Sequence, residues 1–334
     1  MVKGIRMSEK NAGNFLMVGV DDGYAETKVV SRGDKVRIAS LARAGLFGLS
    51  SMGSEDKVGG SYETGGRKFT VSEKIEGDET RFDDYPISEL NRVIIHHALR
   101  LAGMGGKKIK LATGLQVSNY FKGDVRNEEF IAKKQESLSK EVKALDGGAC
   151  ADIVEHLVLP EAVASWFDYA YDDKGNQIEM EGPCGVIDIG GRTTDCVTVL
   201  EGHQIDHARS GTGQTGVMDI YESIATKLRA QHGDGIISRK VLDLAIRTGN
   251  VKRFGKPQNI KSIVQAATDE VTEQVLTEAK RHFGNGAHLD VILFVGGGSG
   301  FMTKLTSYFP NAKVMPEPEF ANARGMYKYL KLNA

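Results

Sequence analysis

Three glycine-rich turns, each directly after a short apolar run, limit the folds open to this chain more than any other feature. The first turn follows residues 15–18 and contains Asp21 and Gly23. The second lies within residues 186–195 (Val-Ile-Asp-Ile-Gly-Gly-Arg-Thr-Thr-Asp), and the third within residues 291–300 (Val-Ile-Leu-Phe-Val-Gly-Gly-Gly-Ser-Gly). A strand that ends in Asp and Gly offers a carboxylate for hydrated Mg²⁺ and backbone N–H groups for phosphate oxygens. Two such turns and a triple-glycine turn therefore predict a nucleotide site built from three places in the chain.

The two Asp-Gly turns divide the chain into halves that begin alike. Asp188 lies 167 residues after Asp21, and a second apolar segment follows the turn in both places. Duplication of one α/β unit would leave such a weak internal repeat. Residues 172–183 are acidic and contain glycine, so they are the best boundary between the halves. Apolar residues at helical spacing up to Phe283 predict a long helix with Pro257 in its first turn.

Composition narrows the class of protein. A chain of 334 residues is long enough for one large or two medium domains. Its net charge of -1 argues against a protein that binds polyanions, and the basic cluster of Lys107, Lys108 and Lys110 is interpreted as a solvated loop. The three cysteines form no Cys-x-x-Cys pair, which indicates reduced thiols. No apolar run approaches the ~20 residues that span a bilayer, and the first residues lack the apolar core of a secretory signal, so we expect a soluble cytoplasmic protein.

Taken together, the three turns resemble those of the actin-like ATPase superfamily, over about residues 15–330. In that superfamily two phosphate hairpins face each other across a cleft, and a third glycine turn holds the nucleoside. Asp-Asp-Gly at 21–23, the short chain, His-His-Ala-Leu at 96–99 and Leu-Pro-Glu-Ala at 159–162 are most similar to the ParM/StbA plasmid-segregation actins. The resemblance implies an α/β, actin-like (ribonuclease H-like, duplicated) fold with two domains around a nucleotide cleft.

The same resemblance implies the domain organisation. A glycine- and serine-rich loop at residues 45–61 is expected to be mobile and to lie near a subunit contact. The expected units are a disordered arm at 1–14, domain I at 15–180 with a small subdomain at about 32–85, domain II at 181–317, and a C-terminal helix at 318–334 that completes domain I.

Four residues are expected to carry the chemistry. By resemblance, Asp21 and Asp188 hold Mg²⁺, through water, although each could instead cap its own turn. Lys28, seven residues after Asp21, is expected to return its ammonium group over the phosphates, with a solvated lysine as the alternative. Glu161 is expected to orient or deprotonate the attacking water; without the resemblance it is a first-turn glutamate favoured by the helix dipole. Glu161 and Asp188 are therefore the predicted catalytic pair.

The expected cofactors are ATP, with GTP left open, and Mg²⁺. Arg192 departs from the family pattern by replacing a smaller residue, and it either contacts phosphate or points to solvent. Tyr24 departs from it as well, because serine or threonine is usual at that place. The nucleotide-binding set that the resemblance implies is Asp21, Gly23, Tyr24, Lys28, Gly190, Gly191, Arg192, Thr193, Thr194, Thr212, Gly213, Asp219, Gly296, Gly297 and Gly298.

The resemblance implies an ATPase that polymerises into nucleotide-dependent helical filaments. Such filaments would separate plasmid copies through an adaptor protein bound to centromere-like DNA, with no membrane partner and no sequence-specific DNA binding by the chain itself. Two alternatives remain: a bacterial or archaeal cytoskeletal or cell-division actin homologue, and an actin-fold small-molecule kinase. A chaperone ATPase is disfavoured because it would need a peptide-binding domain after residue 310, where a short helix remains.

Overall fold

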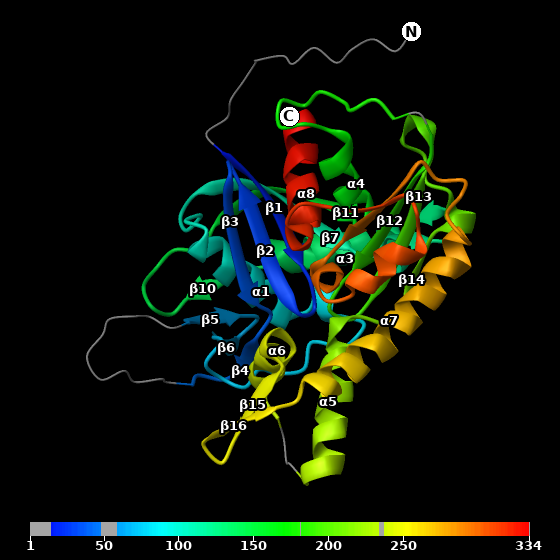
Figure 1. The fold of residues 1–334 in the computed structure, drawn as a ribbon. Helices are drawn as coiled ribbons and strands as arrows, with labels where there is room; N and C mark the ends of the chain where they lie inside the picture. Colours follow the sequence, from blue (N-terminus) through cyan, green and yellow to red (C-terminus); the bar gives the residue numbers. More distant parts are fainter. Residues whose placement is uncertain (1–14, 48–58, 181, 234–236, 334) are drawn as a thin grey trace.

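Two five-stranded sheets with the same strand order form the framework of the molecule (Figure 1). The computed structural model describes residues 15–47, 59–180, 182–233 and 237–333. The expected N-terminal arm and most of the expected mobile loop at 45–61 lie outside the described residues. The strand order in the first sheet is β11 (Asp152–Pro160), β7 (Lys108–Leu115), β1 (Leu16–Asp22), β2 (Glu26–Ser31) and β3 (Asp34–Ala39). The corresponding order in the second sheet is β18 (Ala312–Val314), β17 (Val291–Val295), β12 (Cys184–Ile189), β13 (Thr194–Val199) and β14 (Gly211–Gly213).

The strand pairings repeat as well as the strand order. β1 pairs antiparallel with β2 and parallel with β7, and β12 pairs antiparallel with β13 and parallel with β17. Asp21 lies opposite Lys28 in the first hairpin, and Asp188 lies opposite Asp195 at the same place in the second. The duplication predicted from the two Asp-Gly turns, which the actin-like resemblance also implies, is therefore confirmed, and it extends to all five strands of each sheet.

Helices cover both sheets and connect them. β12 lies at the centre of its sheet, and all six of its residues are buried, as expected for a strand covered on both faces. The helix α1 begins where Ser88 accepts a hydrogen bond from the Asn91 N–H at 3.1 Å. The helices are α1 (Glu89–Leu101), α2 (Val117–Tyr120), α3 (Glu128–Ser139), α4 (Val163–Ala170), α5 (Val217–His232), α6 (Arg239–Thr248), α7 (Lys261–Phe283) and α8 (Ala321–Leu332).

Each half also carries an insertion away from the central sheets. In the first half, a smaller sheet has the order β10 (Lys143–Ala144), β5 (Gly60–Thr64), β6 (Arg67–Val71) and β4 (Ala42–Ala44). In the second half, α6 is followed by the hairpin of β15 (Asn250–Arg253) and β16 (Lys256–Asn259). A further short hairpin joins β8 (Phe121–Lys122) to β9 (Val125–Arg126).

The expected start of the long helix at Pro257 is wrong, because this residue belongs to the second insertion. Pro257 pairs with Lys252 inside the β15–β16 hairpin, and the helix α7 begins four residues later. Proline has no N–H to donate, so it is tolerated on a strand of a two-stranded sheet that leaves one edge unpaired. The apolar face up to Phe283 is as predicted, but a proline alone did not reveal whether it began a helix or ended a hairpin.

α8 returns to the first half and lies against β1 and α4 (Figure 1). Two glycines allow this close approach. A Cβ atom on Gly19 of β1 would lie 2.2 Å from the carbonyl oxygen of Ala323, and one on Gly325 would lie 1.6 Å from that of Ala164. The backbones of α8, β1 and α4 are therefore in direct contact, which leaves the first turn of α8 at the edge of the cleft.

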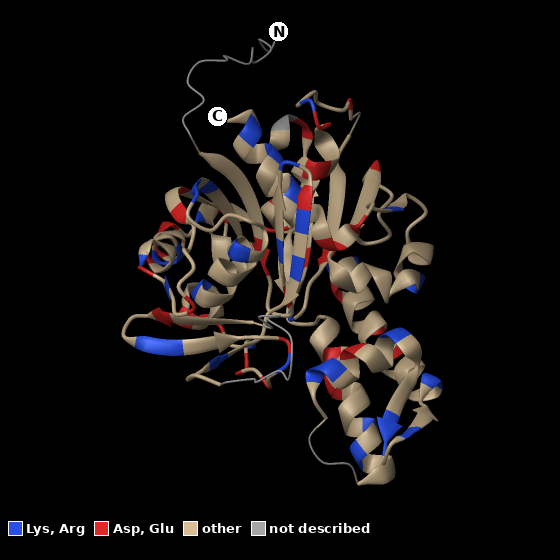
Figure 2. Cartoon of the chain, turned by 90° about the vertical axis from the view of Figure 1, so that its left-hand side faces the viewer, with Lys and Arg blue, Asp and Glu red and all other residues tan. Residues whose placement is uncertain are grey.

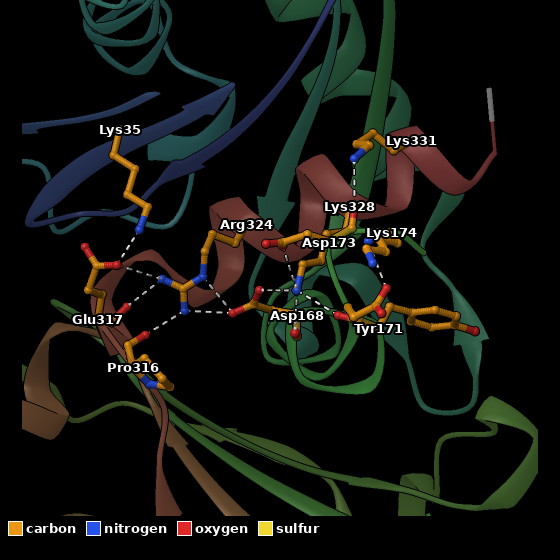
Figure 3. A network of polar contacts seen from close by, with 11 residues as sticks. Lys35, Asp168, Tyr171, Asp173, Lys174, Pro316, Glu317, Arg324, Lys328 and Lys331 are labelled. Atoms are coloured by element: carbon orange, nitrogen blue, oxygen red, sulfur yellow. Dashed lines mark hydrogen bonds and ion pairs between the residues drawn. The ribbon is translucent and has the colours of Figure 1, made fainter. Parts of the chain in front are cut away.

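A polar network fastens α8 where the chain returns from the second half to the first (Figure 3). Asp168 of α4 forms ion pairs with Arg324 at 2.7 Å and Lys328 at 2.9 Å, and its side chain is only 4 % exposed. Glu317, just before α8, pairs with Lys35 of β3. The network thus joins α4, α8 and β3.

Charged residues of both signs are interspersed over both halves (Figure 2). Lys110 lies in β7 and pairs with Glu155 at 2.6 Å, so part of the basic cluster expected in a loop belongs to a strand. Among the described residues, no helix combines the length and hydrophobicity needed to cross a bilayer.

Candidate functional site

A cavity of about 300 Å³ lies between the two central sheets, where β1 and β12 end. Its wall brings together residues that are far apart in the chain and that the sequence singled out. Those predicted residues are Asp21, Gly23, Tyr24, Lys28, Glu161, Asp188, Gly190, Gly191, Thr193, Gly296 and Gly297.

On the first hairpin, neighbouring aspartates face opposite ways because side chains alternate along a strand. Asp21 lines the cavity and accepts a hydrogen bond from the Lys28 ammonium at 3.2 Å. Asp22 lies on the far face, where Lys134 of α3 pairs with it at 2.8 Å and Asn91 donates to it at 2.9 Å. Asp21 and Lys28 are thus available to a ligand, whereas the carboxylate of Asp22 is buried and bound by Lys134 and Asn91.

The second hairpin touches the first. A Cβ atom on Gly191 would lie 2.5 Å from the Cβ of Ala25, so only glycine permits this approach. The first turn of α5 closes the hairpin from behind, because the Val217 and Met218 N–H groups donate to the carbonyls of Gly190 and Gly191 at 3.0 and 2.8 Å. The hairpin backbone is held open toward the cavity by this arrangement.

The third turn packs directly on Asp188. Gly296 has a φ of 80°, which favours glycine, and a Cβ atom there would lie 2.4 Å from the Asp188 carboxylate. Gly298 faces Ile189 in the same way, at 2.2 Å, and does not line the cavity. The turn therefore presents backbone, not side chains, to the cavity.

Four carboxyl groups dominate the electrostatics of the site. Burial raises the pKa of Asp188 to about 6 and that of Asp195 to about 7. Burial, followed by the charges of Asp21 and Asp195, holds the pKa of Glu161 well above its ordinary value. Burial also raises the pKa of Asp21 despite the neighbouring Lys28. So much enclosed negative charge favours a cation between the hairpins.

These residues fit Mg²⁺ bound together with phosphates. Within the described parts of the chain, no three Asp, Glu, His or Cys residues are grouped closely enough to enclose a metal ion by themselves. Magnesium usually keeps several waters and takes one or two carboxylates plus substrate phosphates. Asp21 and Asp188, which both line the cavity, would supply the carboxylates of that mode.

Several predicted residues have other partners. Thr212 donates to Asp195 and accepts from the Ser118 N–H at 3.1 Å, and Asp219 accepts from the Gly216 N–H at 2.7 Å and pairs with Arg81 at 2.6 Å. None of the predicted residues Arg192, Thr194, Thr212, Gly213, Asp219 and Gly298 lines the cavity. Contact of these six with a nucleotide stays a prediction.

Arg192 has partners within the protein, across the gap between the two hairpins. Its guanidinium lies 5.2 Å from the centre of the Tyr24 ring and pairs with Asp83 at 2.7 Å. It therefore joins the second hairpin to the first half of the chain. Tyr24 is 8 % exposed and forms part of the cavity wall.

Sequence reasoning missed residues that complete the wall. Asn322 of α8, Tyr221 of α5, Arg247 of α6 and Phe301 all line the cavity, with the Arg247 guanidinium 5.7 Å from the centre of the Phe301 ring. No local motif marks these four. Asp195, which neighbours the site, did have a signal, because it follows Asp188 by the same seven residues that separate Lys28 from Asp21.

Comparisons with known proteins agree with this fold. The family model described as plasmid segregation protein ParM, N-terminal, matches residues 16–172, and the model described as archaeal actin homologue MreB-like, C-terminal, matches residues 186–307. No curated protein sequence matches the chain closely enough to count as a relative.

Solved structures match over nearly the whole chain. The archaeal actin homologue Ta0583 is 20 % identical, with a TM-score of 0.77 over 96 % of this chain and 100 % of that one, and a further crystal structure of it is a complex with ADP. A 15-stranded ParM filament from Clostridium botulinum is 20 % identical, with a TM-score of 0.78 over 96 % of this chain and 99 % of that one.

Proposed function

Because this chain belongs to the actin-like superfamily, we propose that it binds ATP with Mg²⁺ in the cavity between its two sheets and hydrolyses it. The observation that carries the proposal is the facing pair of Asp21 and Asp188 beside Lys28 and glycine backbone. An archaeal protein of the same fold was crystallised with ADP, which supports a nucleotide in this cavity. The choice of ATP over GTP rests on the resemblance alone.

Each residue has a role that follows from its place. Asp21 and Asp188 would hold the metal, and Lys28 would place its positive charge beside the phosphates. Bound Mg²⁺ supplies charge that neutralises the phosphate oxygens. The backbone N–H groups of the glycine turns contact phosphate, because glycine leaves them uncovered. These residues mainly position and neutralise, which is what phosphoryl transfer requires of a protein.

Glu161 acts on the attacking water. Glu161 lines the same cavity as the two metal-holding aspartates, and burial makes it a stronger base than an exposed glutamate once it is ionised. A cation held by Asp21 and Asp188 would favour that ionised form. Glu161 therefore orients the water and accepts its proton.

The chain polymerises head to tail in the cytoplasm, and the filaments move plasmid DNA through an adaptor. The match of its first half to the ParM model and its likeness to a ParM filament support this branch. A contact that does not close on itself generates an open helical polymer. A second candidate is a cytoskeletal actin, because the second half matches the model of an archaeal actin homologue.

Sedimentation separates these functions from a kinase. With Mg²⁺ and ATP, the protein should pellet as polymer, whereas with ADP it should stay in the supernatant. A small-molecule kinase would remain in the supernatant under both conditions. Nanomolar, sequence-specific DNA binding by this chain alone would contradict the adaptor and would leave the ATPase proposal standing.

Glu161→Ala tests the catalytic role. We expect it to bind ATP but to release phosphate at least ~10-fold more slowly, because a positioned acid or base contributes about 10²–10⁴-fold. Its polymers should also last longer than those of the wild type. Glu155→Ala is the matched control, since Glu155 is a glutamate of β11 that pairs with Lys110 outside the cavity. Equal phosphate release by both variants and the wild type would remove Glu161 from the mechanism.

A further inference from the structure

One buried amide connects both halves of the cleft to α8. Asn322, in the first turn of α8, is 5 % exposed. Its Nδ2 donates to Asp188 Oδ2 at 2.6 Å, and its Oδ1 accepts from the Ala162 N–H at 3.1 Å and from the Ser165 hydroxyl at 2.6 Å. A residue of the second sheet and the chain directly after Glu161 are thus held by the same side chain.

The partners determine which way this amide points. The Ala162 N–H can only donate, so it must face the amide oxygen. The NH₂ group is then directed at Asp188, whose carboxylate accepts hydrogen bonds when it is ionised. Asparagine alone offers a donor and an acceptor at this length. Aspartate lacks the donor, and leucine, although similar in shape, lacks both.

The backbone that Asn322 holds is strained. Ala162 has a φ of 62° and a ψ of -46°, which a residue with a side chain rarely adopts. The Val163 N–H donates to the Glu161 carbonyl at 2.7 Å, so residues 161–163 form the uncommon type of γ-turn with positive φ at its centre. Such a conformation persists where the surroundings hold it, and it is common at functional sites. The hydrogen bond from Ala162 to Asn322 is one of those supports.

We propose that Asn322 is a positioning residue that sets the placement of Glu161 relative to Asp188. It does so by holding the turn after Glu161 with its oxygen and the Asp188 carboxylate with its nitrogen. This inference rests on the proposed function, since it assigns Asp188 to the metal and Glu161 to the attacking water. Groups that orient a metal-holding carboxylate typically contribute about 10–100-fold to metal affinity or activity.

Two substitutions distinguish the contact of Asn322 with Asp188 from its contacts with Ala162 and Ser165. Asn322→Asp keeps an acceptor for Ala162 and Ser165 but turns an oxygen toward Asp188, whereas Asn322→Leu removes both functions. For Asn322→Asp we expect the Mg²⁺ concentration that half-saturates protection of the ADP complex against thermal unfolding to rise about tenfold. Single-turnover phosphate release should fall about 10–100-fold in both variants.

The control tests whether Asn322 merely fastens α8. Lys328, six residues further along α8, also binds α4, through Asp168 at 2.9 Å, and does not line the cavity. Lys328→Met should lower the midpoint of thermal unfolding. The Mg²⁺ dependence and the phosphate release per folded molecule should stay within about threefold of the wild type, a change as small as the loss of a single ion pair usually causes.

The outcomes decide between the two proposals. If the wild type neither binds Mg²⁺–ADP nor releases phosphate from ATP, the proposed function fails, and this inference fails with it. If the wild type does both, and the Asn322 variants match it or change only as Lys328→Met does, the proposed function stands and the positioning role is refuted. A selective loss in the Asn322 variants supports the role.

Discussion

Equivalent positions of the two hairpins carry a basic side chain in one half and an acidic side chain in the other. Lys28 and Asp195 occupy the same register, opposite Asp21 and Asp188. Lys28 directs an ammonium group toward the cavity, whereas Asp195 accepts hydrogen bonds from Thr212 and from the Val117 N–H. One scaffold position therefore places an ammonium group at the cavity in one half and makes a contact between the halves in the other.

A buried histidine should make the protein acid-sensitive. His96 of α1 has no hydrogen-bond partner on either ring nitrogen among the described residues, and burial, with a smaller effect of Arg92, lowers its pKa to about 4. In the unfolded chain a histidine takes up a proton near pH 6.5. Between about pH 6.5 and 4 the unfolded state therefore binds more protons, and stability is lost as the pH falls through that window.

His96→Leu should remove part of this loss. We expect urea unfolding to show the variant gaining stability relative to the wild type between pH 7 and pH 5, because leucine fills a similar volume and does not titrate. His97 and His156, whose pKa values burial lowers to about 4 and about 3, add to this slope, whereas the raised pKa values of Asp188 and Asp195 oppose it. His288→Leu, at an exposed position, is the control. Parallel pH profiles for His96→Leu and wild type would show that His96 does not titrate as described.

At the scale of elements, the β15–β16 hairpin has an unusual residue at its tip. Phe254 is 94 % exposed and has a φ of 48°, and Gly255 follows with a φ of 78°. Hairpin turns with two positive φ values favour Asn-Gly or Asp-Gly. A phenylalanine here gains no burial and strains the backbone.

Phe254→Asn should therefore stabilise the protein by about 1 kcal/mol, because asparagine adopts the left-handed conformation at a lower energetic cost than phenylalanine. Chemical denaturation would measure the change. Phe254→Ala is the control, because it removes the ring, including its contact with Arg253 at 5.5 Å, without relieving the backbone. An equal gain in both variants would trace the effect to the exposed ring rather than to φ.

At the scale of the whole molecule, a segment between β6 and α1 ties the halves together. Arg81 of this segment pairs with Asp219 at 2.6 Å and Glu222 at 2.7 Å, both in α5. Asp219 also caps α5, whose first N–H groups donate to Gly190 and Gly191. The tie thus ends at the helix that supports the second hairpin.

Arg81→Gln should weaken nucleotide binding, because it removes the ion pairs that connect this segment to α5. Its side chain is 19 % exposed, so we expect the dissociation rate of ADP to rise about 3–10-fold, as losing a partly solvated charged hydrogen bond would cause. Stopped-flow release of a fluorescent ADP analogue would measure this rate. Arg67→Gln is the control, because its pair with Glu89 at 2.8 Å lies within the first half. An unchanged rate for Arg81→Gln would show that the tie does not affect the nucleotide.

The sequence by itself determined the duplicated scaffold and the turns that face the cavity. Apolar runs, Asp-Gly turns and the triple glycine are local signals, because strand periodicity and positive φ depend on residues close in the chain. Asp21, Glu161 and Asp188 could therefore be selected by their local sequence and its resemblance to a known pattern. The cap of α1 at Ser88 and the tight turn at Gly65-Gly66 between β5 and β6 depend on neighbouring residues in the same way.

Only the tertiary structure decided which side chains complete the cleft. Asn322 meets Asp188 across 134 positions and Arg192 meets Asp83 across 109, so neither contact has a local signature. The same limit explains Pro257, which suits a helix start or an edge strand equally well until its partner Lys252 is known. Local chemistry specifies how a segment turns, whereas the packing of α8 and α5 against the sheets specifies which distant partner each polar group finds.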